Sequence, residues 1–245
     1  MAVKITGDGI HNVESLYLEL KGRRAHYLKA GSGPPVVLLH GGASDSRDWL
    51  GTMAGLAHRF TFYAPDIIGF GQSERNETGY YLTDFIEFTE EFIKVLGLEN
   101  TDMIGHSFGG RLSAGLAVRG RVRIRRLVLV DTSGLGKITV FGNVLFTGFW
   151  ALRKLLGRPQ PFPRFLAKDG EDYNRIGDTE LRRLRSATLL IWKRHDPYFP
   201  VSLARRAVKM IPGARLEMLP GFGHAPNKQD REAFVRLLLD FLGRG

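Results

Sequence analysis

Residues 105–109, which read Gly-His-Ser-Phe-Gly, restrict the fold of this chain more than any other segment. Residues 102–104 before them favour a strand, and the small residues of 110–117 after them favour a helix. A serine at so sharp a turn has a strained backbone, and glycine two positions away on either side avoids a steric clash. The pattern predicts that Ser107 projects from the carboxyl edge of a sheet, although five residues alone also fit a glycine-rich turn.

Three other predicted strands end at residues that suit the same chemistry. The apolar run at 36–39 is a short buried strand and ends in His-Gly-Gly-Ala. The apolar run at 187–192 is followed by Asp196, and the alternating run at 215–219 leads to His224. The chain therefore carries a serine, an aspartate and a histidine, in that order, at the ends of predicted strands.

On these residues the chain resembles the α/β-hydrolase superfamily, in its lid-bearing branch of esterases, lipases and carbon–carbon-bond hydrolases. The order serine, aspartate, histidine is the order of that superfamily. Residues 66–73 also resemble its Asp-x-x-Gly-x-Gly-x-Ser loop, and matching segments fall within 35–131 and 187–242. One departure is Lys193, because the family usually has glycine there; we expect it to put a cation beside the acid.

The resemblance implies an α/β-hydrolase fold with a mostly parallel eight-stranded sheet and helices on both faces. It also implies a short helical lid, inserted after the sixth strand. The hydrolase core would then comprise residues 1–132 and 186–245, and the lid or cap insertion residues 133–185. Strands that alternate with helices independently indicate a parallel sheet covered on both faces.

Hydrophobic periodicity places the remaining elements. Two alternating runs around a Lys-Gly-Arg turn predict an antiparallel hairpin at the start of the sheet. Apolar stripes predict the main helices, the first of them capped by Thr83. The predicted ranges are 16–20 and 25–28 for the hairpin, 59–64 and 127–130 for strands, and 84–96, 203–211 and 231–242 for helices.

Composition is consistent with a single enzyme domain. The chain has 245 residues, 43% of them hydrophobic, which suffices to bury the core of one α/β domain. It has no cysteine, which excludes disulfides, thiolate metal sites and a cysteine nucleophile and suits a reducing compartment. Residues 1–20 lack the apolar segment of a secretory signal, so we expect a cytoplasmic enzyme.

The whole chain has a net charge of +10, and its positive charge is concentrated in the second half. Residues 119–126 alone contain five arginines, which raises the alternative of a nucleic-acid site. No nucleic-acid-binding module accompanies them, and a solvated connection between a helix and a strand explains them equally well. We therefore expect no nucleic-acid partner; attraction to anionic lipid or to a carboxylate-bearing substrate fits better.

Residues 138–152 form an uncharged, aromatic-rich segment within the predicted lid. The segment is too short, and too interrupted by glycine and asparagine, to cross a membrane. We expect Phe146, Phe149 and Trp150 to line an apolar acyl pocket. The alternative is an interfacial helix that touches a membrane surface, because cations follow the segment.

The resemblance assigns a role to each candidate residue. Ser107 is the nucleophile, His224 the general base, and Asp196 the acid that orients the imidazole. The backbone N–H groups of Gly42 and Phe108 bind the oxyanion. No metal-binding or nucleotide-binding motif occurs, so we expect neither metal nor cofactor.

Other polar residues near these motifs have structural explanations. We expect His106 to pack under the sheet edge, His40 to brace the oxyanion loop, and His195 to be exposed in a loop. Asp131 follows the strand after the nucleophile helix, a place from which some relatives supply the acid. It is therefore the alternative to Asp196.

Three functions fit these residues. The first is hydrolysis of carboxylic esters with a small, apolar substrate. The second is carbon–carbon-bond hydrolysis of vinylogous diketones, because residues 107–110 and 133–136 resemble that subfamily; it needs an arginine such as Arg111 to bind a carboxylate. The third is a non-catalytic binding protein, which usually has lost a triad residue. The sequence gives no indication of the oligomeric state.

Overall fold

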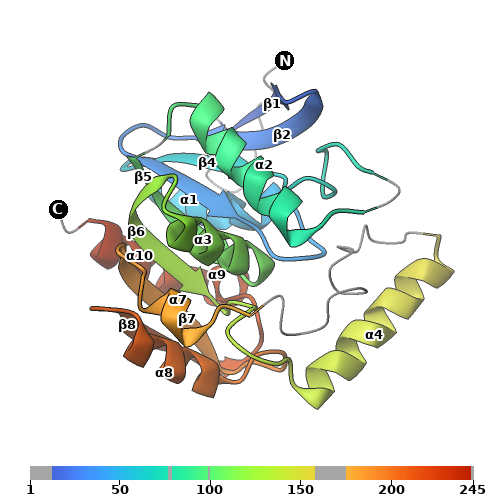
Figure 1. Cartoon of the computed structure of the whole chain (residues 1–245), viewed down its shortest axis with the longest axis vertical. Helices are drawn as coiled ribbons and strands as arrows, with labels where there is room; N and C mark the ends of the chain where they lie inside the picture. The colour runs from blue at the N-terminus through green and yellow to red at the C-terminus, as the bar shows by residue number, and fades with distance from the viewer. Residues whose placement is uncertain (1–12, 77–78, 99, 158–174, 244–245) are drawn as a thin grey trace.

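The computed structural model of the chain describes residues 13–76, 79–98, 100–157 and 175–243. Its strands form one eight-stranded sheet in the order β1-β2-β4-β3-β5-β6-β7-β8. This confirms the predicted fold class (Figure 1). The strands are β1 (Glu14–Leu20), β2 (Arg23–Ala30), β3 (Pro35–Leu39), β4 (Thr61–Pro65), β5 (Asn100–His106), β6 (Arg123–Val130), β7 (Ala187–His195) and β8 (Arg215–Phe222).

The sheet is antiparallel at its β1 edge and parallel elsewhere. β1 and β2 form the predicted hairpin, and β2 pairs with β4 antiparallel. Lys21 and Gly22 both have positive φ, the conformation of the two-residue turn that matches the twist of a hairpin. The six strands from β4 to β8 pair in parallel, so their carboxyl ends all lie at one edge.

Helices cover the two faces of the sheet and bury two hydrophobic cores. Helices α2, α3 and α8 pack over one face, whereas α1 and α10 pack over the other. Neighbouring residues of β3 belong to different cores, as expected for a strand buried on both faces. The helices among the described residues are η1 (Ser46–Trp49), α1 (Leu50–Leu56), α2 (Leu82–Val95), α3 (Phe108–Arg119), α4 (Val140–Leu155), α7 (Asp178–Leu181), α8 (Val201–Met210), α9 (Pro226–Gln229) and α10 (Arg231–Leu242).

The N-terminus of α2 differs from the sequence prediction. Thr83 lies inside the helix and Tyr81 is the N-cap, so the prediction of a Thr83 cap is wrong. The carboxylate of Asp84 accepts a hydrogen bond of 2.7 Å from the backbone N–H of Tyr81. An acid in the first turn accepts a hydrogen bond from this backbone N–H and also complements the helix dipole. The helix can therefore begin at Leu82, before the predicted cap.

The arginine-rich segment before β6 makes ion pairs within the protein. Arg125 and Arg126 reach the fully buried carboxylate of Asp102 at 3.0 and 3.3 Å. Arg121 lies 3.9 Å from Glu90 on α2. These ion pairs join the segment to β5 and α2. Part of its positive charge therefore has a structural role.

Helix α4 follows β6 within the segment that we predict to be a lid, and it lies at the edge of the molecule (Figure 1). Its beginning is attached to the loop after β7, where the N–H of Thr139 donates to the carbonyl of Tyr198 at 2.9 Å. Many of its apolar side chains are exposed. No helix among the described residues has the length and apolar character needed to span a bilayer. The lid boundaries stay a prediction.

Candidate active site

Ser107 occupies a strained turn between β5 and α3. Its φ of 50° and ψ of −111° lie outside the regions that non-glycine residues favour. A Cβ atom at Gly109 would lie 2.2 Å from the carbonyl oxygen of Leu39, and one at Gly105 would lie 2.4 Å from the carbonyl oxygen of Gly109. Only glycine fits at either position, which is the physical reason for the Gly-x-Ser-x-Gly pattern.

The structure brings together the three residues that the sequence singles out. His224 Nε2 lies 2.9 Å from Ser107 Oγ, and His224 Nδ1 lies 2.7 Å from Asp196 Oδ2. Ser107 follows β5, Asp196 follows β7 and His224 follows β8, so the carboxyl edge of the parallel strands collects them. A hydrogen bond from Nδ1–H to Asp196 leaves Nε2 as the acceptor for the serine hydroxyl.

The carboxylate of Asp196 is surrounded by N–H donors. Its Oδ1 accepts hydrogen bonds from the backbone N–H groups of Tyr198 at 2.7 Å and Phe199 at 3.1 Å, and its Oδ2 accepts from His224. The side chain is fully buried. These three hydrogen bonds fix the position of the carboxylate against the imidazole of His224.

The loop after β3 lies directly against Ser107. A Cβ atom at Gly41 would lie 3.4 Å from Cβ of Ser107, and one at Gly42 would lie 3.8 Å from Cβ of Phe108. The backbones of Gly42 and Phe108 are therefore neighbours, as an oxyanion site requires. Phe108 begins α3, and N–H groups in the first turn of a helix have no acceptor within the helix.

His40 braces this loop, as the sequence predicts. Its Nδ1 donates to the carbonyl of Gly41 at 2.7 Å, and its Nε2 accepts from the backbone N–H of Ile67 at 2.9 Å. An acceptor nitrogen requires a neutral imidazole. Burial lowers the pKa of His40, which is consistent with that form.

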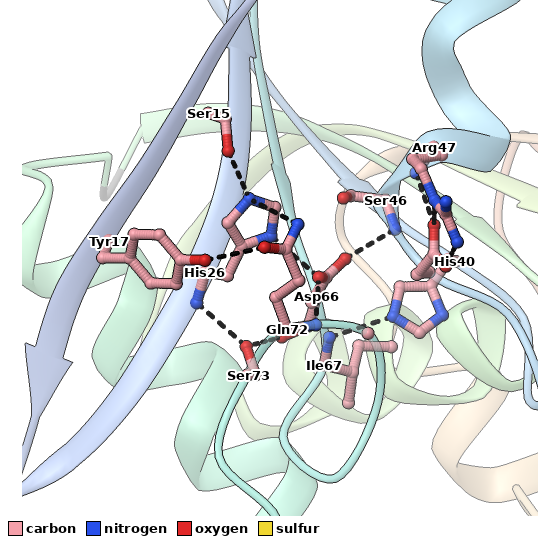
Figure 2. Close-up of polar contacts among 12 residues, drawn as sticks. Ser15, Tyr17, His26, His40, Ser46, Arg47, Asp66, Ile67, Gln72 and Ser73 are labelled. Atoms are coloured by element: carbon pink, nitrogen blue, oxygen red, sulfur yellow. Dashed lines mark hydrogen bonds and ion pairs between the residues drawn. The ribbon is translucent and has the colours of Figure 1, made fainter. Parts of the chain in front are cut away.

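A buried polar network joins the same loop to the N-terminal hairpin (Figure 2). Asp66 accepts hydrogen bonds of 2.7 Å from the N–H of Ser46, the N–H of Gln72 and Nδ1 of His26. Burial raises the pKa of Asp66, but the hydrogen bonds from His26, Gln72 and Ser46 outweigh it and hold the pKa at about 2. The 66–73 loop thus anchors the chain on both sides of the loop after β3. The sequence does not indicate this role of His26, because its strand shows only a hairpin pattern.

His106 supports the loop that carries His224. It is buried, and its Nε2 donates to the carbonyl oxygen of His224 at 2.5 Å. The two imidazole rings are 5.0 Å apart. The predicted packing under the sheet edge is therefore accompanied by a specific hydrogen bond, which the sequence does not indicate because it spans 118 residues.

His106 should make the protein sensitive to acid. Burial, and then the nearby His224, lower the pKa of His106 to about 3, whereas an unfolded histidine has a pKa of about 6.5. Between these values the unfolded chain binds more protons, so the free energy of unfolding should fall as the pH drops from about 6.5 to about 3. We expect His106→Gln, which retains an N–H donor, to weaken this dependence in denaturant titrations at several pH values.

The exposed His58 provides the matched control for this experiment. His58→Gln should keep the slope of the parent, because the side chain of His58 stays exposed to water in the folded protein. Burial also lowers the pKa of His40. His40 therefore makes the free energy of unfolding fall at low pH in the parent and in both variants alike. Parallel curves for His106→Gln and the parent would contradict the assignment.

Lys193 does not pair with Asp196. Its side chain is buried, and Nζ lies 2.8 Å from Oδ2 of Asp230 and also donates to the carbonyl of Pro220. The expectation of a cation beside the acid therefore needs correction, because Asp230 provides the charge partner. His195 is exposed as predicted, but it ends β7 instead of lying in a loop.

Asp131, the alternative acid, belongs to the same cluster. One oxygen each of Asp131 and Asp196 and one ring nitrogen of His224 all lie within 4.8 Å of one another. Such a group could hold a cation, although Asp196 and His224 are already hydrogen-bonded to each other. Burial and then repulsion from Asp196 raise the pKa of Asp131 well above its ordinary value.

The predicted pocket residues lie on α4. Phe146 is 36% exposed and Phe149 is 46% exposed. The side chain of Trp150 is outside the described residues. The predicted role of all three in substrate binding stays a prediction.

The fold and the arrangement of Ser107, His224 and Asp196 define a class of protein, the α/β hydrolases with a serine, histidine and aspartate at the carboxyl edge of the sheet. A model of the alpha/beta hydrolase fold family matches residues 34–175, which is more than half of the chain. The chain belongs to this family.

Known proteins similar to the chain include both types of hydrolase considered above. A 2-hydroxymuconate semialdehyde hydrolase of Pseudomonas putida is 29% identical over 257 residues, which cover 90% of this chain and 91% of that protein. An uncharacterised protein of Mycobacterium tuberculosis is 28% identical over 272 residues, covering 90% of this chain and 79% of that protein. Among solved structures, a carboxylesterase of Bacillus subtilis has a TM-score of 0.80 at 23% identity, with 96% of this chain and 93% of that chain covered.

Proposed function

We propose that this hydrolase cleaves carboxylic esters of apolar acids through a covalent acyl-enzyme. The observation that carries the proposal is the continuous hydrogen-bonded chain from Ser107 through His224 to Asp196, at 2.9 and 2.7 Å. A serine hydroxyl alone is a weak nucleophile, so a base within hydrogen-bond distance is the requirement that this chain meets.

The reaction follows from the geometry in two balanced steps. Ser107 Oγ attacks the ester carbonyl carbon, and its proton moves to His224 Nε2. Asp196 holds Nδ1–H and stabilises the imidazolium. The C–O bond to the alcohol then breaks, and the alcohol leaves with the proton from Nε2. Water, deprotonated by the same nitrogen, releases the acid and restores the serine.

The backbone N–H groups of Gly42 and Phe108 are proposed to bind the oxyanion that forms in each step. Loss of one such donor typically raises the barrier by about 3 kcal/mol. Because backbone groups bind the oxyanion, side-chain substitution at Phe108 would leave the donor in place. The hydrogen bonds of His40 and Asp66 support this function by fixing the loop that carries Gly42.

Carbon–carbon-bond hydrolysis is the second candidate, because the similar protein from Pseudomonas putida is a 2-hydroxymuconate semialdehyde hydrolase. A substrate of that type carries a carboxylate, which a buried cation would bind. Arg111 is buried one helical turn after Ser107, but a Cβ atom at Gly115 would lie 3.0 Å from its Nη1. The guanidinium therefore extends along α3 away from the serine, which favours the neutral ester. An intact triad argues against a non-catalytic binding protein.

A substrate panel separates the two candidates. We would measure kcat/KM for p-nitrophenyl esters of rising acyl length beside a 2-hydroxy-6-oxo-dienoate. Ester hydrolysis predicts that esters are turned over faster and that medium chains are preferred to acetate. A dienoate turned over faster than every ester would overturn the ester proposal and support the second candidate.

The apolar face of α4 allows a test of the acyl pocket. If Phe149 contacts the acyl chain, Phe149→Asp should raise KM for medium-chain esters and spare acetate esters. Each lost methylene contact is worth about 0.8 kcal/mol, or about fourfold in KM. Val140→Asp is the matched control, because Val140 lies on the same helix and is 82% exposed.

The same variants test the alternative, weak contact of α4 with a membrane surface. In that case Phe149→Asp should reduce binding to anionic vesicles and leave the kinetics with soluble esters unchanged. Equal losses on short and medium esters, with no vesicle binding by the parent, would contradict both roles and assign α4 to structure alone.

A further inference from the structure

A second hydrogen-bonded chain of serine, histidine and aspartate lies between the N-terminal hairpin and the 66–73 loop (Figure 2). Ser15 Oγ lies 2.8 Å from Nε2 of His26, and Nδ1 of His26 lies 2.7 Å from Oδ2 of Asp66. The corresponding distances through His224 in the candidate active site are 2.9 and 2.7 Å. The order of atoms is also the same, because in both groups the carboxylate binds Nδ1 and the hydroxyl binds Nε2.

The acid of this second group is ionised and held in place. Besides the imidazole of His26, Asp66 binds the backbone N–H groups of Ser46 and Gln72, each at 2.7 Å. Burial raises the pKa of Asp66, but these hydrogen bonds hold it at about 2. Asp196 likewise accepts hydrogen bonds from two backbone N–H groups and one imidazole. A carboxylate on Nδ1 keeps the proton of a neutral imidazole there and leaves Nε2 as the acceptor.

The imidazole of His26 is fixed by its neighbours. Its side chain is 1% exposed, and the backbone N–H of the same residue donates to Ser73 Oγ at 3.0 Å. The ring of Tyr17 packs against it, with the two centroids 5.0 Å apart. The neutral imidazole can therefore accept the hydroxyl proton of Ser15, as a base must to activate a serine. Ser15 is only partly buried, so a reagent in solvent can reach its hydroxyl.

A side-chain amide lies beside the same imidazole. The hydroxyl of Tyr17 donates to Oε1 of Gln72 at 2.7 Å, and Nε2 of Gln72 lies 3.5 Å from Nε2 of His26 (Figure 2). The amide N–H groups thus face the region where a bond to Ser15 would form. A glutamine amide can stabilise an oxyanion. The candidate active site offers two backbone N–H groups for this purpose, so a single amide predicts a slower reaction.

We propose that Ser15 is a second nucleophilic serine, which takes up a phosphoryl or acyl group from an activated aryl ester. Ser15 Oγ attacks the phosphorus or the carbonyl carbon, and its proton moves to Nε2 of His26. The bond from that atom to the aryl oxygen breaks, and the phenol leaves with the proton. No atom changes its oxidation state. The proposal is independent of ester hydrolysis at Ser107, because the two groups share no residue.

Diethyl p-nitrophenyl phosphate is the probe, because the diethylphosphoryl group that it transfers stays on a serine and can be counted by intact-mass spectrometry. We expect two groups per chain in the parent, one in Ser107→Ala, one in Ser15→Ala and none in the double variant. Peptide mapping locates each group. Labelling of Ser15 should be about 100-fold slower than that of Ser107, because one oxyanion donor is missing.

Two controls separate activation by His26 from simple exposure of a hydroxyl. Ser44 is also partly buried, but its hydroxyl donates to the carboxylate of Asp48 and should stay unlabelled. His26→Gln should slow the labelling of Ser15 by about a hundredfold or more, because it removes the general base. Should His26→Gln fail to fold, Gln72→Ala, at an exposed position, should slow it by about tenfold or more.

Absence of a group on Ser15 in the parent would overturn the proposal. Equal labelling of Ser44 and Ser15 would also overturn it, and so would an unchanged Ser15 rate in His26→Gln or in its replacement variant. Failure of the proposed function gives a different result: Ser107 then stays unlabelled while Ser15 reacts. A structural role of the Ser15 hydroxyl alone predicts no covalent group on it.

Discussion

Ser107→Ala is expected to abolish ester hydrolysis, with a loss of more than about a hundredfold in kcat, because removal of a triad residue usually costs far more than that. The substitution removes only the hydroxyl group, and the oxygen of that group lies 2.9 Å from Nε2 of His224. The melting temperature should stay within a few degrees of the parent. Steady-state kinetics and thermal unfolding of the purified variant measure the two effects.

Ser113 is the matched control, because it lies on α3 in the interior and its hydroxyl donates to the carbonyl of Gly109 at 2.8 Å. Ser113→Ala should keep the chemical step and lose about 1 kcal/mol of stability, the usual worth of one hydrogen bond. Residual activity above about a hundredth of the parent rate in Ser107→Ala would contradict its assignment as nucleophile.

Asp196→Asn is expected to lower kcat by about 10³ or more. An asparagine in this place can present its amide group to Nδ1 and favour the wrong tautomer of His224, so that Nε2 no longer accepts the serine proton. Asp131→Asn should leave the rate near that of the parent, because Asp196 already provides the carboxylate at 2.7 Å. The measurement is kcat with a single p-nitrophenyl ester at neutral pH.

The order of the two effects decides which acid orients the base. If Asp131→Asn lowered kcat strongly and Asp196→Asn lowered it only slightly, Asp131 at the end of β6 would be the acid that orients His224. Near-parent rates in both single variants, followed by a large loss in the double variant, would mean that the two carboxyl groups are interchangeable.

Local patterns were enough to predict the strands and the helices α2, α3, α8 and α10, but not the short helix α1. The continuous apolar runs of the parallel strands, the alternation in the hairpin and the apolar stripe over 231–242 each reflect burial on a face, which is encoded by neighbouring residues. The helix start at Thr83 was wrong because the Asp84 carboxylate, one residue further on, caps the backbone of Tyr81. Capping depends on which side chain reaches the free N–H group, which periodicity does not show.

The sequence by itself determined the class of fold and the three residues that meet at the sheet edge, because strand ends and a strained turn leave local signatures in glycine, small residues and apolar runs. Only the tertiary structure decided what surrounds them. The hydrogen bond from His106 to the His224 carbonyl, the pairing of Lys193 with Asp230 and the approach of Asp131 to Asp196 join segments far apart in the chain. Ionisation and positioning depend on such distant neighbours through burial and charge, and no local pattern records them.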